Sequence, residues 1–363
     1  MAALLFAGGC GAGRMPAAPR NVERIVFLGD SITDGHTLPL LVCQALAEAG
    51  RTPPVCINAG IGGDTAAGMR TRVERDVLVH QPTLVTLSVG INDVLRGVTQ
   101  EAYEADVTAV ADRLRAEKIP MLLLTTSILG PRNAEADRKL DGYNAFLRRL
   151  ARQNGYRVAE VNGLMREARA GGVNVMEADD VHLNREGYRA MARAVLDALD
   201  AENVPVPKEL EPALMPGLIG RWKIRPATGP LDAAAVAALE ADDPAWKNYA
   251  LPETEAQAHW WMDQERQRGF ATALEKVAGP GGKYLGVAAI ESPAARRVYF
   301  NPGASLQAIW LNGKEIYRLP ADEFRGWHAG RDRVAAELRA GPNTVVIETG
   351  SQFFLSVTDD NTW

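Results

Sequence analysis

Short apolar runs alternate with longer segments of helical periodicity along the first 200 residues of the chain. The runs have the length of buried strands, and the segments between them repeat their apolar residues every three or four positions, as amphipathic helices do. The expected strands lie at residues 25–28, 54–58, 84–89, 119–126 and 156–161. The expected helices lie at residues 38–49, 65–75, 101–118, 134–153 and 184–199.

Strands that alternate with helices in this way predict a parallel sheet covered by helices on both faces. We expect residues 21–204 to form a flavodoxin-like three-layer α/β/α sandwich with a five-stranded sheet in the order 2-1-3-4-5. In that order the loops after the first three strands meet at the carboxyl edge of the sheet. Open α/β sheets bind their ligands at this edge.

The pattern changes after residue 204. Several prolines in residues 205–220 indicate a linker, or a strap that lies over the first domain. Residues 252–275 are polar and expected to be partly helical. The residues of this stretch that we expect to anchor its packing are Trp260, Trp261 and Met262.

Strand-like runs dominate the rest of the chain. They lie at residues 284–290, 297–301, 306–311, 344–348 and 353–358. Asn312-Gly313 separates two such runs, which is the strongest short signal for a two-residue hairpin turn. We therefore expect residues 221–363 to form a mainly-β, jelly-roll-like sandwich.

Composition and the amino terminus bear on partners and location. A net charge of -5 gives no reason to expect nucleic acid or an anionic membrane surface as a partner, and no apolar run is long enough to span a bilayer. Residues 1–20 are apolar and then Pro-rich, and Ala-Gly-Gly before Cys10 resembles the end of a lipoprotein signal peptide. We expect export, as a periplasmic or outer-membrane lipoprotein or a secreted protein, with membrane contact only through a lipid on Cys10. The segment lacks a basic start, so a disordered tail, a cytoplasmic location and an incomplete N-terminus stay open.

Two further cysteines, Cys43 and Cys56, fall in a predicted helix and a predicted strand with apolar neighbours. We expect them to be buried small hydrophobic residues rather than a disulfide or a pair of metal ligands. A bridge between them stays open for an exported protein.

Unusual polar residues follow the first three predicted strands. The first strand is followed by Gly29-Asp30-Ser31, which places a serine at the start of a helix, beside backbone N–H groups that lack partners. A structural alternative is that Asp30 or Ser31 only caps this helix. The second strand leads into Asn58-Ala-Gly-Ile-Gly-Gly-Asp64 and the third into Gly90-Ile-Asn-Asp93.

A fourth polar group, Asp179-Asp180-Val-His182, precedes the last predicted helix. The spacing of Asp179 and His182 lets the carboxylate accept the Nδ1 proton while Nε2 faces Ser31, which is the arrangement nucleophilic acyl transfer needs. Asp180 is adjacent, so an assignment of the acid one residue further along stays open. The oxyanion requires preorganised donors, and the candidates are the backbone N–H groups of Ser31 and Gly63 and the amide of Asn92.

These four groups, in this order, resemble the SGNH (GDSL) hydrolase superfamily over roughly residues 22–200. The family is named for its Ser, Gly, Asn and His, which fall here on Ser31, Gly63, Asn92 and His182, and its spacing favours Asp179 as the acid. The resemblance implies a serine esterase that works without a cofactor through an acyl-enzyme. We expect a short, chiefly acetyl, ester of a carbohydrate as substrate. Alternatives are a lysophospholipase or thioesterase-type acylhydrolase and a catalytically inactive glycan-binding protein.

Other polar residues near these groups have structural interpretations. We expect Asp30 and Asp93 to support the loops, and Asp34 and Asp64 to cap or close turns. Of the other histidines, we expect His36 to lie at the surface or face the substrate and His80 to be structural. The sequence shows no cluster with metal-ligand spacing and no phosphate-binding loop, so we expect no metal.

The C-terminal segments IWLNGKEIY and LRAGPNTVVIETG resemble galactose-binding-like jelly rolls. As a sugar-binding module, the domain would use Trp310, Trp327 or Tyr317 as stacking platforms. We favour the alternative in which these aromatic residues are core or interdomain contacts and the domain is a scaffold.

Overall fold

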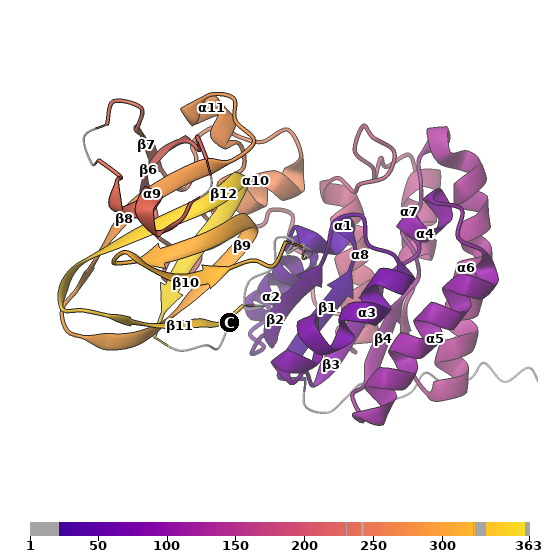
Figure 1. Ribbon diagram of the computed structural model, residues 1–363. Coiled ribbons are helices and arrows are strands. Elements are labelled where there is room, and N and C mark those ends of the chain that lie inside the picture. The colour runs from indigo at the N-terminus through magenta and orange to yellow at the C-terminus, as the bar shows by residue number, and fades with distance from the viewer. Residues whose placement is uncertain (1–21, 230, 241–242, 322, 324–331, 360–363) are drawn as a thin grey trace, which may run out of the picture.

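The computed structural model describes residues 22–229, 231–240, 243–321, 323 and 332–359 (Figure 1). Residues 1–20 with Cys10, and Trp327, lie outside this described part, so the expectations stated for them stay predictions. None of the described helices combines the length and the apolarity that a membrane span requires.

The N-terminal domain is built on a five-stranded sheet in the order β2-β1-β3-β4-β5, as predicted. All neighbouring strands in it run parallel. The central strand β1 is fully buried from Ile25 to Leu28, which explains why its sequence is an unbroken apolar run. The strands are β1 (Arg24–Gly29), β2 (Val55–Gly60), β3 (Leu84–Ser88), β4 (Met121–Leu124) and β5 (Arg157–Ala159).

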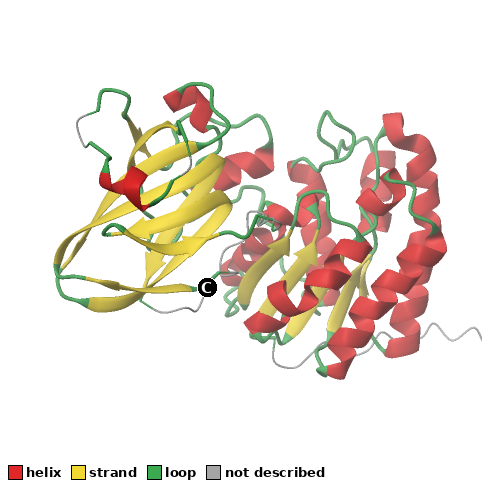
Figure 2. Cartoon of the chain, viewed as in Figure 1, coloured by secondary structure: helices red, strands yellow, loops and turns green. Residues whose placement is uncertain are grey.

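Helices cover both faces of this sheet (Figures 1 and 2). One layer contains α3 (Ala66–Asp76), α5 (Gln100–Ala116) and α6 (Ala134–Asn154). The other contains α2 (Thr37–Glu48), α7 (Val161–Ala170) and α8 (Arg185–Ala198). Two short helices, α1 (Ser31–Asp34) and α4 (Ile91–Leu95), begin directly after β1 and β3 at the carboxyl edge of the sheet.

The helix α7 was not expected from the pattern, which extended the fifth strand to residue 161. In the structure β5 ends at Ala159 and Val161 already opens α7. The apolar residues of this stretch belong to two elements, because Val161 and Met165 are buried on one face of the helix. A three-residue strand followed at once by a helix is too short for its period to be recognised, so periodicity alone does not divide the two elements.

The C-terminal domain is an antiparallel sheet in the order β10-β9-β12-β8-β6-β7, with β11 paired to β9. Its strands are β6 (Arg221–Pro226), β7 (Lys247–Ala250), β8 (Tyr284–Ser292), β9 (Arg296–Leu311), β10 (Lys314–Arg318), β11 (Val334–Leu338) and β12 (Gly341–Thr358). The predicted hairpin joins β9 to β10, and both of its turn residues, Asn312 and Gly313, have positive φ as a type I′ turn requires. Three short helices accompany the sheet: α9 (Ala233–Ala237), α10 (Trp260–Gln267) and α11 (Leu274–Ala278).

Each of the long strands β9 and β12 replaces two strands of the prediction. The residues between the predicted halves are small or polar, yet the chain continues through them with a register shift between Thr349 and Phe353. A bulge keeps a strand hydrogen-bonded while it breaks the alternation of apolar and polar residues. On the inner side, Gly303 lies against the ring of Phe354, where a Cβ atom would overlap the ring.

Trp310, one of the proposed sugar platforms, is buried within this sheet at 6% exposure. Tyr317 is half-buried, and its hydroxyl donates to Asp332. Both observations agree with the scaffold interpretation of these two residues. The likeness to galactose-binding-like domains stays a prediction.

The proline-rich segment after α8 is tied to the N-terminal domain. Arg189 of α8 donates to the carbonyl of Pro207 at 3.0 Å. Gln44 of α2 donates to the carbonyl of Glu209 and accepts from the N–H of Glu211. These contacts make residues 205–211 a strap across α2 and α8.

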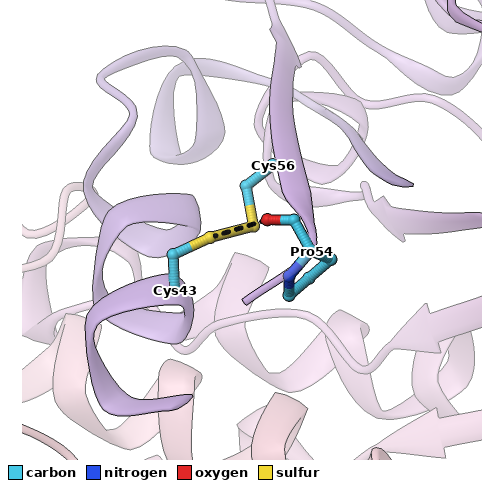
Figure 3. The surroundings of a disulfide bond; sticks show 3 residues. All are labelled: Cys43, Pro54 and Cys56. Atoms are coloured by element: carbon cyan, nitrogen blue, oxygen red, sulfur yellow. Dashed lines mark hydrogen bonds between the residues drawn. A yellow bond between two sulfur atoms is a disulfide. The ribbon is translucent and has the colours of Figure 1, made fainter. Parts of the chain in front are cut away.

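Cys43 of α2 and Cys56 of β2 form a disulfide (Figure 3). The preference for two unlinked buried cysteines is therefore wrong. Both residues are only half-buried. Cys56 is the second residue of the edge strand β2, and the carbonyl oxygen of Pro54 lies 3.5 Å from Cys43 Sγ. Apolar neighbours in the sequence indicated burial, but they carried no information on which helix turn lies beside which strand position.

The two domains meet at a buried polar cluster that consists of His36, Asn58, Glu265 and Arg268. Asn58 donates to His36 Nδ1 at 3.1 Å, and Glu265 Oε1 lies 3.4 Å from the same nitrogen. His36 was expected at the surface or facing the substrate; at 6% exposure it is instead covered by the C-terminal domain. The C-terminal domain therefore reaches the turn that follows Ser31.

Burial controls the charge of this cluster. It raises the pKa of Glu265 to about 8, against the opposing effect of Arg268. Burial, together with the Arg268 charge, lowers the pKa of His36 well below its ordinary value. Both shifts favour the uncharged forms of His36 and Glu265 at the point where the two side chains meet.

Replacing Glu265 with Gln is expected to change how stability depends on pH. Between the ordinary Glu value of 4.5 and the folded pKa of about 8, only the folded state keeps this proton. Wild-type stability relative to Glu265→Gln should therefore fall as pH rises through this window. The measurement is the thermal unfolding midpoint of both proteins from about pH 5 to about pH 8, with the exposed Glu255→Gln as control. A constant difference across this range would contradict the prediction.

Candidate active site

Ser31 is presented by a sharp turn from β1 into α1. A Cβ atom on Gly29 would lie 2.1 Å from Oγ1 of Thr33, so the turn has room only for glycine. Asp30 Oδ1 accepts from the N–H of Ile32 at 3.0 Å, which starts the helix at once. The serine is therefore held in the first helical turn at the carboxyl edge of the sheet, half-buried.

His182 reaches Ser31 from the loop between α7 and α8. Its Nε2 lies 2.9 Å from Ser31 Oγ, and its Nδ1 lies 2.5 Å from Asp179 Oδ2. The other oxygen of Asp179 accepts from the N–H groups of Val181 and His182 at 3.0 and 2.9 Å. The structure thus brings together three residues that lie up to 151 positions apart in the chain.

The electrostatics set the direction of these hydrogen bonds. Partial burial acts to raise the pKa of Asp179, but the bonds from the His182 ring and the two backbone N–H groups outweigh it and lower the pKa to about 2. The ionised carboxylate can only accept, so Nδ1 is the donor toward Asp179. In the tautomer that this bond selects, Nε2 has no proton and accepts from the Ser31 hydroxyl. This is the orientation a general base requires.

Asp180 faces away from His182. Its carboxylate accepts from Arg132 Nε at 2.9 Å and from the Arg132 N–H at 3.1 Å. Its backbone has φ of 64°, which turns the side chain out of line with its neighbour. Of the two adjacent acids, Asp179 is the one that contacts the imidazole.

The expected oxyanion donors differ in whether they already donate a hydrogen bond. Within the described residues, the backbone N–H groups of Ser31 and Gly63 donate no hydrogen bond. Gly63 has φ of 77°, which a residue with a side chain rarely adopts. The Asn92 amide donates to the carbonyl of Asp64 at 3.0 Å and lies 3.4 Å from Asp30 Oδ2. Two of the three donors therefore have no hydrogen-bond acceptor among the described residues. The third, the Asn92 amide, is bonded within the same group of loops.

The expected supporting carboxylates hold loops. Asp93 accepts from the N–H of Ala66 with both oxygens, at 3.1 and 3.2 Å, and so joins α4 to α3. Asp34 Oδ2 accepts from the N–H of Gly62 at 2.9 Å. Burial raises the pKa of both Asp30 and Asp93 to about 6, because a charge at either position is poorly solvated.

Arg72 is a residue of this region that the sequence analysis missed. Its guanidinium donates to the carbonyls of Gly29 and Ala59 at 2.9 and 2.7 Å, which joins the ends of β1 and β2. It also pairs with Asp64 at 2.6 Å. The available signal was a charged residue on the apolar face of a predicted helix, three positions after the buried Met69.

His80, which was expected to be structural, ends the short 3-10 turn Leu78–His80 that precedes β3 and is 1% exposed. Burial lowers its pKa to about 4, and Arg333 Nη2 lies 3.3 Å from its Nδ1. Among the residues that the structure describes, no group of three or more His, Cys, Asp or Glu side chains could hold a metal ion.

A comparison with known protein families matches residues 27–190 to the GDSL-like lipase/acylhydrolase family. The N-terminal half of the chain is a GDSL-like lipase/acylhydrolase (SGNH) domain. Its activity class is accordingly that of the GDSL esterases, which hydrolyse carboxylic esters. The matched segment contains all the site residues described above, from Asp30 to His182.

Curated relatives of this GDSL domain include esterases. Esterase TesA of Pseudomonas aeruginosa is 29% identical over 191 residues, which cover 50% of this chain and 90% of that protein. An acetylxylan esterase of Geobacillus stearothermophilus is 25% identical over 218 residues, which cover 50% of this chain and 95% of that protein. Among solved structures, LAE5, an alpha/beta hydrolase from the metagenome of Lake Arreo, matches with a TM-score of 0.47 at 25% identity, over 52% of this chain and 98% of that chain.

The adjacent acids of the GDSL domain allow a matched test. In Asp179→Asn, the amide oxygen is expected to take the two backbone N–H groups, so the NH₂ faces His182 Nδ1 and forces the wrong ring tautomer. We expect kcat for ester hydrolysis to fall about 10²- to 10⁴-fold. Asp180→Asn loses only its pair with Arg132, and asparagine tolerates the positive φ, so its kcat should stay within about threefold of wild type.

Steady-state kinetics on p-nitrophenyl acetate measures both variants, with circular dichroism to check folding. Equal losses in the two variants, or a larger loss in Asp180→Asn, would overturn the assignment of Asp179.

Proposed function

We propose that this chain is a serine esterase that removes short acyl groups, chiefly acetyl, from carbohydrate substrates. The observation that carries the proposal is the hydrogen-bonded chain from Asp179 through His182 to Ser31. A serine beside an oriented imidazole is the minimum that acyl transfer through a covalent intermediate needs.

The proposed reaction has two halves. Ser31 Oγ attacks the ester carbonyl as its proton passes to His182 Nε2, and the developing oxyanion is held by the N–H groups of Ser31 and Gly63 and by the Asn92 amide. For this, Asn92 exchanges one of its present contacts for the oxyanion. His182 then protonates the leaving alcohol, and the acyl group stays on Ser31. Water, deprotonated by His182, releases the acid and restores the hydroxyl.

The carbohydrate and acetyl parts of the proposal are supported by one of the relatives. The relative from Geobacillus stearothermophilus, which is matched over 95% of its length at 25% identity, is an acetylxylan esterase. Another, at 29% identity, is named only as an esterase. A lysophospholipase or thioesterase-type acylhydrolase is the second candidate, and acyl-chain preference separates the two.

Ser31→Ala is expected to reduce p-nitrophenyl acetate hydrolysis to the rate of the buffer, because no other described hydroxyl lies beside His182 Nε2. Wild type should prefer acetyl over octanoyl and palmitoyl p-nitrophenyl esters by at least about tenfold in kcat/KM. Initial rates across this series measure both effects, and the unfolding midpoint of Ser31→Ala controls for folding. Substantial activity in the variant would refute the nucleophile, whereas a preference for palmitoyl esters would favour the second candidate.

We also propose that the protein is exported. The Cys43–Cys56 disulfide supports this, because disulfides persist mainly in oxidising compartments. Purified native protein alkylated without reductant is expected to leave both cysteines unlabelled, and reductant should expose both to the label. Peptide mass mapping reads out the two states. Full labelling before reduction would remove the support for export.

A further inference from the structure

We propose that helix α10 of the C-terminal domain forms one wall of the active-site entrance and that its aromatic pair, His259 and Trp261, stacks on the sugar ring of the substrate. This inference deepens the proposed function, on which it rests. It places selectivity for the alcohol part of the ester in a segment outside the GDSL domain.

The start of α10 contacts both segments that carry the Ser31–His182 pair. Trp261 lies against Gly35, four positions after Ser31, where a Cβ atom would come within 2.6 Å of the indole ring. His259 Nδ1 lies 3.8 Å from Glu177 Oε2, and the N–H of Glu177 donates to the carbonyl of His182 at 2.8 Å. Figure 1 shows α10 on the side of the C-terminal domain that faces the N-terminal domain.

The neighbouring Trp260 anchors the helix. Its ring packs on Tyr188 of α8 at a centroid distance of 6.0 Å, and the guanidinium of Arg185 lies over it at 5.8 Å. The Tyr188 hydroxyl donates to the carbonyl of Ile32, in the same helical turn as Ser31. One turn on from Trp260, Glu265 enters the buried cluster with His36. α10 is therefore fixed to the turn that presents the nucleophile.

The platform that we propose consists of two nearly parallel, partly exposed rings. The rings of His259 and Trp261 are nearly parallel, at 24°, with centroids 6.4 Å apart. The His259 side chain is 42% exposed although its Nδ1 edge is buried toward Glu177, and Trp261 is half-exposed. A flat, partly exposed aromatic surface suits the C–H face of a pyranose ring, which contacts aromatic rings through dispersion and buries apolar area. A flexible acyl chain gains less from such a surface, because it presents no flat face.

The test compares two acetyl esters that differ in the alcohol. Peracetylated methyl xyloside carries a ring that can stack, and ethyl acetate carries none. In His259→Ala and Trp261→Ala, we expect KM for the xyloside to rise about tenfold. For ethyl acetate, kcat/KM should fall less than it does for the xyloside, so the ratio of the two kcat/KM values changes by at least about threefold.

The choice of variants keeps the result interpretable. His259→Ala removes an exposed ring, so it reports on the platform even if Trp261→Ala folds poorly because of its contact with Gly35. Trp246→Ala is the matched control, since Trp246 lines a separate pocket of about 640 Å³ on the C-terminal sheet. We expect it to leave both substrates unchanged.

The outcomes distinguish this inference from the proposed function. Equal effects of His259→Ala on the two esters, or no effect on either, would overturn the platform while leaving the esterase intact. If Trp246→Ala instead lost activity only on the xyloside, sugar binding would be assigned to the C-terminal pocket, and the platform at His259 and Trp261 would be overturned. A wild type whose hydrolysis of ethyl acetate equals that of Ser31→Ala would refute the esterase itself.

Discussion

The site depends on a single steric constraint at the end of β1. The chain passes from strand to helix at Gly29, where the Thr33 side chain occupies the space of a Cβ atom. Arg72 holds this strand end by its carbonyl and ties it to the end of β2, and Asp30 caps the helix that follows. These contacts fix the first turn of α1. Because that turn is fixed, Ser31 Oγ stays within hydrogen-bond distance of His182 Nε2, which comes from a distant loop.

Local sequence was sufficient for much of this arrangement. The five apolar strands and their order followed from periodicity and from the rules for parallel sheets, and the loops with the site residues followed from the strand ends. The contact between Asp179 and His182 was also foreseeable, because it spans one turn of chain. Local spacing could not choose between Asp179 and Asp180, because the choice depends on Arg132, which comes from a different segment.

Features that depend on contacts between distant segments were not predictable in the same way. The disulfide needs a particular turn of α2 beside a particular residue of β2. The long strands β9 and β12 keep their pairing through a bulge that breaks their alternation. The burial of His36 is a third example, because it is caused by a helix more than 220 residues later in the chain. A histidine in a polar turn gives no local sign of the surface that will cover it.

The order of synthesis gives the interdomain contact a further consequence. Domains generally fold from the N-terminus as the chain leaves the ribosome. All segments that carry Ser31, Asp179 and His182 precede residue 204, so the nucleophile can meet its base while the C-terminal sheet is still being made. The surface around Gly35 and Tyr188 stays uncovered until α10 has emerged, some 60 residues later. For that interval the nascent protein exposes an apolar patch beside a site that is already assembled.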